Sequence, residues 1–503
     1  MHLCLSKILD KCTNELSKKN YIDLLKTVDK ALKLDPNNAQ LLKFRLDALL
    51  GLGTAYDDLG FLRKLSWYRS TDPEVLYHLA QAFWLREQYH CSVVILCFMV
   101  SVGGEAQILN ARLRELGYSR VKIYFINTQR IGHLACESDA WLRKRARLQA
   151  SPNELNIFIG QEKVCNYAYL DMLANYQKIE LSDYLFNLHS SRPLLLNDKF
   201  YGQMPYDVNS AKRQAFSIEN QLHNAVVVYK QADRLLELTE KQTELKNSIY
   251  NEFGIHAKRP IVCLHVRDSK YLTSVVGGKD TTYHDYRDVD ILNYESTIRW
   301  LIGAGYTVVR IGQYTNQKLS IDSDFYIDLN QRNESSNVSL AELIFIRDCV
   351  FYLGINSGPF AIAASFDKPC LLVNCAPYVH VYGKNIWNIF KKLIDDEGKA
   401  KSFVEIAQGT TLKNNLGIEE RVLDIYNGQV LAGYGYSYIE NTSSEIIQAT
   451  IEFEGVLSNR NQYDDRLLRQ YFAQIPNDCG YLNKNIVIPH SFLQANKKLF
   501  NVE

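Results

Sequence analysis

The sequence predicts an α/β protein in which two sheet domains follow a helical N-terminal module. Apolar strands alternate with helical stretches from Val121 onward, which is typical of parallel sheets. A second and clearer strand–helix alternation covers residues 261–374 and has the order of a doubly wound fold. The segment before Val121 instead places apolar side chains at helical spacing. The chain is therefore expected to hold several domains of different kinds.

The composition indicates an ordinary multidomain protein. A chain of 503 residues is too long for one hydrophobic core, and its 47% hydrophobic and 22% charged residues are average values. The net charge of +1 produces no field that would attract nucleic acid or an anionic membrane. Nucleic acid is therefore not expected as a partner.

The cysteines and the apolar segments point to a cytoplasmic location. The 11 cysteines form no CxxC pair and show no disulfide framework, so reduced thiols are expected and structural zinc is not. The N-terminus lacks a signal-peptide core. The longest apolar run, Cys91–Val102, is shorter than the roughly 20 residues that span a bilayer, so it predicts a buried helix. We expect a cytoplasmic protein without a transmembrane segment. Any contact with the inner membrane is expected to be peripheral.

Residues 1–117 are predicted to form the helical module. Asp35-Pro36 returns as Asp72-Pro73, a spacing close to the helix–turn–helix period of about 34 residues in tetratricopeptide repeats. Asp is a good N-cap and Pro fits the first helical position, so both pairs predict helix starts. The consensus is degraded. The module either holds a peptide or protein partner or is a plain helical cap on the rest of the chain.

Residues 118–255 are predicted to form an N-terminal sheet domain. Val121–Ile126 and Leu155–Gly160 have strand patterns, and the loop Gln129–Leu134 is expected between the first strand and a helix from about Glu137. Residues 231–253 predict one long amphipathic helix that would connect the two sheet domains.

Residues 256–460 are predicted to form the second sheet domain, and residues 461–503 a C-terminal helical tail that packs back on the N-terminal half. The pattern runs through an irregular segment at 268–287 and a region after 399 that is harder to assign. The expected elements are strands at 261–266, 306–311, 325–329, 350–354 and 370–374, and helices near 289–303, 339–348 and 357–366.

Two strand ends in this second sheet domain suggest a phosphate site. The strand 261–266 leads directly into Arg267. His265 lies two residues earlier, so its side chain is expected on the same face of the strand. A guanidinium at a strand end can bind a diphosphate with two hydrogen bonds. The alternatives are an ion pair between Arg267 and Asp268, a structural role for His265, and for Asp268 a role in orienting Arg267 or capping a turn.

The second strand end carries Asn356, Ser357 and Gly358 before a small-residue helix. Helix amides there would receive a phosphate, and Gly358 would let it approach the backbone. An ordinary strand–helix turn is the alternative.

The N-terminal sheet supplies the candidates for acid–base chemistry. Arg130, Gly132 and His133 follow the first strand, where a neutral histidine can accept a proton near pH 7. Glu137 and Asp139 lie behind it as further candidates. A capping or packing role for His133 is the alternative.

Further polar residues are candidates for the same region. Asp285 and Arg287 belong to a cluster at 283–288, Arg310 ends a strand, and Glu342 lies on the helix before the Asn-Ser-Gly loop, where it would bind a ribose or sugar hydroxyl. Solvated loop and surface helix are the alternatives. No Asp-x-Asp motif follows a strand in either sheet domain, so neither a metal nor another cofactor is expected.

Five motifs in order resemble a bacterial family of GT-B glycosyltransferases that often carry tetratricopeptide repeats. The motifs lie between about 120 and 460, at Gln129–Ala135, Cys263–Ser269, Asp285–Asp290, Val309–Gly312 and Gly354–Gly358. The resemblance implies two facing Rossmann-like domains with a donor nucleotide sugar on the second one. The strand end at His265 and Arg267 is also similar to the His-x-Arg motif of fucosyltransferases, although Asp268 departs from it. The loop at Ser357 and Gly358 is similar to the donor loop of heptosyltransferases.

The expected function is metal-independent, inverting transfer of a sugar from a nucleotide-diphosphate sugar to a glycan, lipid-linked or protein acceptor. One alternative is a protein O-glycosyltransferase whose repeats hold the peptide. The other is a non-catalytic scaffold with a decayed transferase fold.

Overall fold

The computed structural model describes residues 2–147, 151–191, 196, 199, 228–255, 259–268, 270, 282–312, 315–332, 335–378, 381–413, 417–475 and 486–503. The chain divides into two compact units. Unit 1 comprises Met1–Ile126, Ala150–Glu162 and Gln177–Gly202, and unit 2 comprises Asn127–Gln149, Lys163–Tyr176 and Gln203–Glu503.

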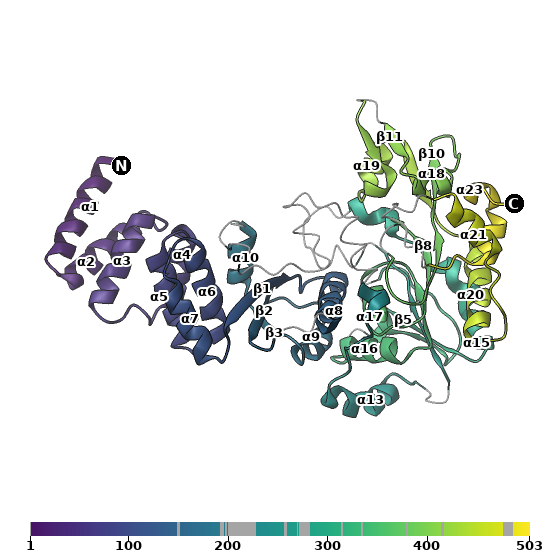
Figure 1. The fold of residues 1–503 in the computed structure, drawn as a ribbon, viewed down its shortest axis with the longest axis horizontal. Helices are drawn as coiled ribbons and strands as arrows, with labels where there is room; N and C mark the ends of the chain where they lie inside the picture. The colour runs from purple at the N-terminus through teal and green to yellow at the C-terminus, as the bar shows by residue number, and fades with distance from the viewer. Residues whose placement is uncertain are drawn as a thin grey trace. The chain divides into compact units, whose positions relative to one another are not determined.

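Unit 1 begins with seven helices, each of which packs against its neighbour in sequence (Figure 1). The apolar run at 91–102 forms a buried helix, as the sequence predicted. Membership of the tetratricopeptide family stays a prediction. The helices are α1 (His2–Ser17), α2 (Tyr21–Leu32), α3 (Ala39–Gly51), α4 (Leu59–Tyr68), α5 (Pro73–Trp84), α6 (Tyr89–Ser101) and α7 (Ala106–Glu115).

Only one of the two Asp-Pro pairs starts a helix. Asp72 caps α5, where its carboxylate accepts from the Glu74 amide at 3.1 Å. In front of α3 the cap is Asn38, whose side chain accepts from two backbone amides, while Asp35 accepts from the Asn38 side chain. The repeat signal therefore marked the position of a turn but not the capping residue.

A small parallel sheet completes unit 1. It has the order β1-β2-β3 and is followed by α10 (Asp183–Ser191). One hydrophobic cluster runs from α3 through α7 into this sheet and α10, and includes Phe83, Ile123, Ile157 and Leu188. The helices and the sheet thus share a core across the boundary predicted at residue 117. The strands are β1 (Arg120–Ile126), β2 (Glu154–Gly160) and β3 (Lys178–Leu181).

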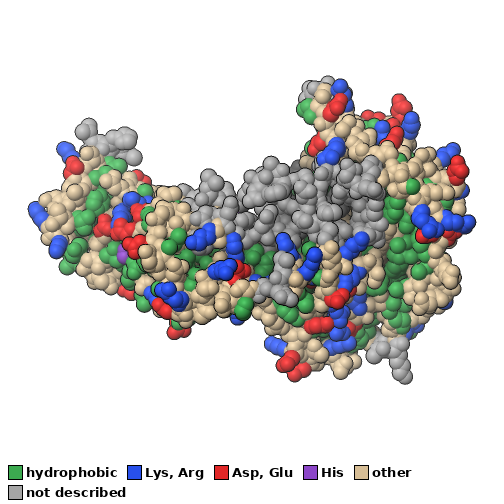
Figure 2. Space-filling model, in the orientation of Figure 1, with side chains coloured by type: hydrophobic (Ala, Val, Ile, Leu, Met, Phe, Trp, Pro, Cys, Tyr) green, Lys and Arg blue, Asp and Glu red, His purple; other side chains and the backbone are tan. Residues whose placement is uncertain are grey.

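The surface of the helical module carries charges of both signs side by side (Figure 2). Lys43 pairs with Asp47 at 2.8 Å and with Glu74 at 2.9 Å, and Arg45 pairs with Asp29 at 2.9 Å. Within the described ranges, no helix is both long and apolar enough to cross a membrane.

Unit 2 is built on a six-stranded sheet in which all strands are parallel. The order is β6-β5-β4-β7-β8-β9, which is the strand order 3-2-1-4-5-6 of the doubly wound Rossmann fold. The parallel, doubly wound strand arrangement that the sequence predicted for residues 261–374 is confirmed. The strands are β4 (Ile261–His265), β5 (Thr307–Ile311), β6 (Tyr326–Asp328), β7 (Phe351–Gly354), β8 (Cys370–Cys375) and β9 (Ile386–Phe390).

Helices cover both faces of this sheet, which is why its central strands are buried throughout. Figure 1 shows α16 (Val338–Asp348) and α17 (Gly358–Ser365) on one side, and α15 (Glu295–Gly303) and α20 (Ser443–Leu457) on the other. The strand order reverses between β4 and β7. In such folds the crevice at the carboxyl ends of these two strands is where ligands bind.

The region predicted as the N-terminal sheet domain is divided between the two units. Its strands belong to unit 1, whereas α8 (Ile131–Arg147) and α9 (Tyr167–Ala174) belong to unit 2, where α8 packs on α17 and α9 on α16. Helix α8 begins at Ile131 and not near Glu137, so most of the predicted loop is the first turn of a helix.

The predicted connector helix at 231–253 is wrong in its first part. The structure places α13 at Glu240–Glu252, with Thr239 and Gln242 forming a capping box. This reciprocal pair of side-chain hydrogen bonds satisfies the first free amides and starts the helix there.

The remainder of unit 2 follows the main sheet. Two small antiparallel sheets pair β10 (Lys392–Asp395) with β13 (Tyr436–Ile439) and β11 (Thr411–Lys413) with β12 (Glu419–Arg421). The tail contacts α20 and α18 of unit 2, where the sequence predicted packing on the N-terminal half. The helices are α18 (Phe403–Ala407), α19 (Gly428–Gly433), α21 (Arg466–Ala473), α22 (His490–Ala495) and α23 (Lys497–Phe500). Short 3-10 turns are η2 (Thr282–Arg287), η3 (Ile291–Tyr294), η4 (Leu329–Arg332) and η5 (Val422–Asp424).

Candidate functional site

The two strand ends singled out in the sequence meet at the point where the strand order reverses. Strand β4 pairs with β7 in the register His265 to Gly354. The Nδ1 atom of His265 lies 3.0 Å from the Oγ atom of Ser357. A Cβ on Gly354 would come within 2.5 Å of the His265 carbonyl oxygen, so only glycine fits there. The pairing brings the His265–Arg267 and Asn356–Gly358 segments together at the carboxyl ends of β4 and β7. This is the position of the ligand-binding crevice in folds with this strand order, and we call it the crevice below.

His265 is a neutral side chain in this crevice. The residue is 7% exposed, and burial, followed by the charges of Arg267, Arg310 and Arg287, lowers its pKa to about 3. Its Nε2 atom has no hydrogen-bond partner among the described residues. Gly312, at φ 100°, lies against the ring on the Nε2 side. Ser357 thus holds one ring nitrogen, and the other has no partner in the described part of the chain.

Arg267 is fixed by the η2 segment and not by its neighbour Asp268. Its Nη1 atom pairs with the Asp288 carboxylate and donates to the His284 carbonyl at 3.0 Å. Asp268 accepts instead from the backbone amides of Lys270 at 3.0 Å and Asn316 at 2.6 Å. Of the roles considered for Asp268, capping of a turn is the one that the geometry shows.

Several cations gather around Arg267. Arg287 donates to the Asn356 carbonyl, and its buried Nε atom has no partner among the described residues. Lys391 donates to the carbonyls of Tyr286 at 3.1 Å and Asp288 at 2.6 Å. These contacts bring three cations from three separate segments to the crevice.

Burial and the neighbouring charges shift the pKa values of His284, Lys391 and Asp288. Burial, followed by the charges of Arg287, Arg267 and Arg130, lowers the pKa of His284 to about 3. Burial likewise lowers the pKa of Lys391 to about 8, where Asp288 and Glu440 favour its charge and Arg267 and Arg287 oppose it. Burial also raises the pKa of Asp288 to about 6. Positive charge crowded into a partly dry crevice favours an anionic ligand.

Two helices place their N-termini beside this cluster. A Cβ on Gly358 would lie 2.6 Å from Ile131 Cγ2 and 3.3 Å from the Gly132 amide nitrogen, and one on Gly132 would lie 3.2 Å from Gly358 Cα. The N-terminal turns of α8 and α17 therefore touch through two bare Cα atoms. We predicted that Gly358 admits a phosphate to the backbone, whereas its missing side chain makes room for α8. The positive ends of both helix dipoles nevertheless point to one place.

His133 and Glu137 form a pair on the first turns of α8. The Nδ1 atom of His133 lies 2.8 Å from Glu137 Oε1, and the side chains are 23% and 3% exposed. A carboxylate at Nδ1 holds the proton there when the ring is neutral, so that Nε2 can accept a proton. The two residues therefore have the geometry of a general base and its orienting group.

Asp139 is placed differently from the prediction. The Asp139 carboxylate is fully buried and accepts from Arg143 Nε at 2.8 Å, so it has no path to a substrate.

Arg310, Glu342 and Asn356 also have protein partners. Arg310 is buried and pairs with Asp328 at 3.1 Å. Glu342 accepts from the Gly312 amide at 2.9 Å, and burial raises its pKa to about 7. Asn356 donates to the Pro377 carbonyl at 2.9 Å, while its buried Oδ1 atom has no partner among the described residues. These three residues support the site through their protein partners, and Asn356 also keeps a buried acceptor without a partner among the described residues.

The sequence interpretation missed Lys391, and it included His284 and Asp288 only as members of the polar cluster at 283–288. Lys391 directly follows the apolar strand β9, and a lysine at the carboxyl end of such a strand is a signal that could have been noticed. Asp288 lay inside a quoted motif, but nothing in the motif indicates that it pairs with Arg267.

A cavity of about 490 Å³ lies next to the cation cluster of Arg267, Arg287 and Lys391. Asp288 lines the cavity and also contacts Arg267 and Lys391. Across the part of the chain that the structure describes, no group of three or more His, Cys, Asp or Glu side chains is arranged to hold a metal ion. The cavity is lined by Asp285, Asp288, Val289, Asp290, Ile291, Leu292, Gln317, Lys318 and Glu440.

Similarity to known proteins is weak. No protein-family model and no curated protein matches the chain. Among solved structures, ADP-heptose LPS heptosyltransferase II of E. coli shares 15% identity at a TM-score of 0.36, over 53% of this chain and 90% of that one. A family 9 glycosyl transferase of Veillonella parvula shares 11% identity at a TM-score of 0.36, over 55% of this chain and 87% of that one. The iron-containing dodecameric glycosyltransferase TibC of E. coli shares 13% identity at a TM-score of 0.29, over 54% of this chain and 64% of that one. Similarities this weak carry no argument here.

The contact between the two helix N-termini is testable by adding methyl groups. Gly358→Ala should lower the free energy of unfolding by about 1–3 kcal/mol, because the new Cβ overpacks against Ile131. Denaturant titration of the full chain measures this. Gly303→Ala is the matched control, since a Cβ at that helical glycine meets nothing within 4 Å and should be neutral or stabilising. Equal effects of the two substitutions would contradict the contact.

Proposed function

We propose that the protein is a glycosyltransferase that uses a nucleotide-diphosphate sugar as donor. The observation that carries the proposal is the cation cluster at the reversal of strand order, next to two helix N-termini. Arg267 and Arg287 can bind phosphate oxygens through paired donors, and amides of the first turn of α8 and the Gly358 amide of α17 can add to this. A diphosphate matches a site with several cations because it carries more than one negative charge.

The unpaired atoms in the crevice support a donor that also bears hydroxyl groups. His265 Nε2 can donate to a phosphate or a sugar oxygen, and Asn356 Oδ1 can accept from a hydroxyl. Both belong to side chains that are almost fully buried, at 7% and 4% exposure. A ligand with donors and acceptors would satisfy them, whereas a plain anion would leave Asn356 unpaired.

The proposed reaction is a displacement at the anomeric carbon. The acceptor hydroxyl attacks this carbon and gives its proton to His133 Nε2, while Glu137 holds the Nδ1 proton. The bond from the anomeric carbon to the phosphate oxygen breaks, and the nucleoside diphosphate leaves with an additional negative charge. Arg267, Arg287 and the helix N-termini stabilise that charge more in the transition state than in the ground state. We infer a single displacement with inversion and no metal requirement.

The acceptor is proposed to be a glycan, a lipid-linked sugar or a protein. A peptide acceptor held by the helical module belongs to the same proposal. Cytoplasmic location and a bacterial source also stay proposals.

Binding of the donor tests the site assignment. A thermal-shift panel of UDP-, GDP-, ADP- and CMP-linked sugars identifies the base, and calorimetry then gives the affinity. Arg267→Ala should weaken donor binding roughly 10- to 100-fold, because a charge-assisted hydrogen bond contributes about 1.5–3 kcal/mol. Arg299→Ala on α15 is the control, since Arg299 is 56% exposed and, within the described residues, pairs with Glu295 on its own helix. Absence of any nucleotide binding would favour the non-catalytic scaffold.

Replacement of His133 tests the base. His133→Ala should lower kcat roughly 10²- to 10⁴-fold for transfer of the donor sugar to an acceptor or to water, with little change in donor affinity. Glu137→Gln should have a smaller effect in the same direction. Release of nucleoside diphosphate measures both rates. An unchanged kcat in His133→Ala would show that the base lies elsewhere.

The depressed pKa of Lys391 predicts a pH dependence of binding. Its charge is present below about pH 8 and is lost as the pH rises through that value, because burial favours the neutral amine. Above pH 7 the phosphates are already ionised. The affinity for a nucleoside diphosphate should therefore fall about three- to tenfold between pH 7 and 9.5. Lys391→Met should bind more weakly at pH 7 and lose this pH dependence, and a persisting decline would assign it to another group.

A further inference from the structure

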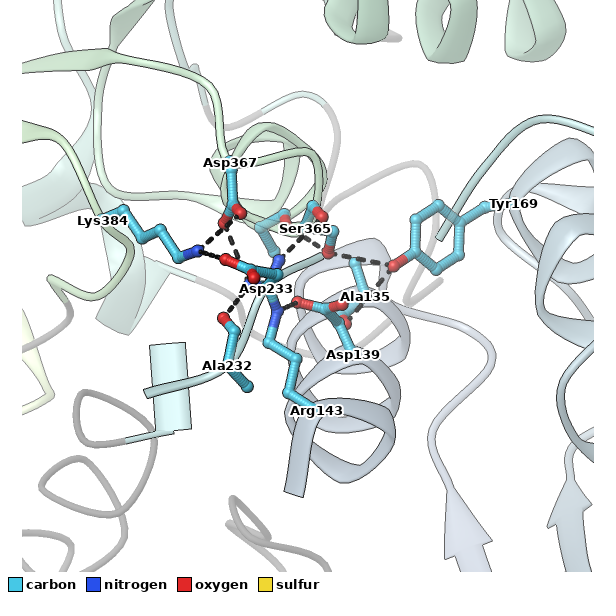
Figure 3. A network of polar contacts seen from close by, with 10 residues as sticks. Ala135, Asp139, Arg143, Tyr169, Ala232, Asp233, Ser365, Asp367 and Lys384 are labelled. Carbon is cyan, nitrogen blue, oxygen red and sulfur yellow. Dashed lines mark hydrogen bonds and ion pairs between the residues drawn. The ribbon is translucent and has the colours of Figure 1, made fainter. Parts of the chain in front are cut away.

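Arg143 is a fully buried cation for which the proposed chemistry has no use. Its Nε atom donates to Asp139 at 2.8 Å and its Nη2 atom donates to the Ser365 carbonyl at 3.0 Å (Figure 3). Its Nη1 atom donates to the Ala232 carbonyl at 3.0 Å and pairs with Asp367, also at 3.0 Å. The guanidinium thus joins the last turns of α8 to the end of α17.

These contacts show that α8 and α17 run parallel. Gly132 meets Gly358 at the N-terminal ends, and Arg143 meets Ser365 at the other ends. From Gly132 to Arg143 helix α8 rises about 16 Å, and from Gly358 to Ser365 helix α17 rises about 10 Å. An arginine side chain leans back toward the N-terminus of its helix and spans about this difference. The two contact points therefore determine the relative height of the helices.

Two parallel helices with touching N-termini repel each other at that end. Each N-terminus carries about half a positive charge, and Arg130 and the cation cluster add to it. A cation at the C-terminal ends stabilises both dipoles, and Arg143 occupies that place. Tyr169 adds a second tie, because its hydroxyl lies 3.1 Å from Ser365 Oγ and 3.5 Å from the Ala135 carbonyl of α8. The pair is held together far from the phosphate site.

We propose that Arg143, with Asp139 and Asp367, is a positioning residue that keeps α8 in register with α17 and so holds Arg130 and His133 over the phosphate site. This rests on the proposed function. Asp139, considered above as a base, is assigned the role of orienting Arg143. Loss of the tie lets the first turn of α8 move away from Gly358, which weakens anion binding without removing any group that binds the anion.

The test uses inorganic pyrophosphate and the full chain. Arg143→Lys keeps the charge but loses the planar fork. Asp367→Asn removes the carboxylate after α17, which is 18% exposed and pairs with Arg143 at 3.0 Å and with Lys384 at 3.2 Å. Both should weaken pyrophosphate binding about five- to twentyfold by calorimetry, at a temperature well below each unfolding midpoint. Asp233→Asn is the matched control, because it removes another carboxylate that pairs with Lys384, at 2.7 Å, from a side chain that is 98% exposed. It should bind as the wild type does.

A double-mutant cycle separates positioning from general loosening. If Arg143 acts through α8, the effect of Arg130→Ala on pyrophosphate affinity should shrink in the Asp367→Asn background, while the effect of Arg267→Ala stays the same. The positioning role would be overturned if both folded variants bound pyrophosphate with unchanged affinity. It would also be overturned if Arg130→Ala, like Arg267→Ala, had the same effect in the Asp367→Asn background as in the wild type. Failure of the wild-type chain to bind pyrophosphate would instead remove the proposed function.

Discussion

The parallel pairing of β4 with β7 is the interaction on which the site depends. Because the strand order reverses between these two strands, α15 after β4 and α17 after β7 lie on opposite sides of the sheet (Figure 1). The register that places His265 opposite Gly354 also puts the imidazole within hydrogen-bond distance of Ser357. Backbone hydrogen bonds of a buried sheet thereby align two segments that lie about ninety residues apart.

Burial determines the charges in this crevice. His265 and His284 are neutral at physiological pH because charged imidazole is costly in a dry site that already holds arginines. The guanidinium groups remain charged, and backbone carbonyls and Asp288 hold them in place. The crevice thus combines fixed cations, neutral hydrogen-bond donors and an unpaired acceptor on Asn356. Such a combination suits a ligand with both phosphate and hydroxyl groups.

The sequence located the main elements of the second sheet because buried parallel strands are short apolar runs bounded by clear turns. It located His265, Arg267 and Ser357 for the same reason, since they lie at the end of such a run or within three residues after it. It failed for Asp139, where a carboxylate four residues before an arginine on one helix becomes a buried pair once α17 covers it. It also failed for Arg310, whose partner Asp328 lies on the next strand of the sheet.

The sequence by itself determined the parallel sheet, the strand-end positions of His265 and Arg267, and the turn before α17, because these depend on local periodicity and turn chemistry. Only the tertiary structure decided which charges face one another and which helices touch. The meeting of Gly132 with Gly358, the tie through Arg143 and the place of Lys391 join segments far apart in the chain. Pairing energies between such segments arise from packing and desolvation, and no local pattern records them.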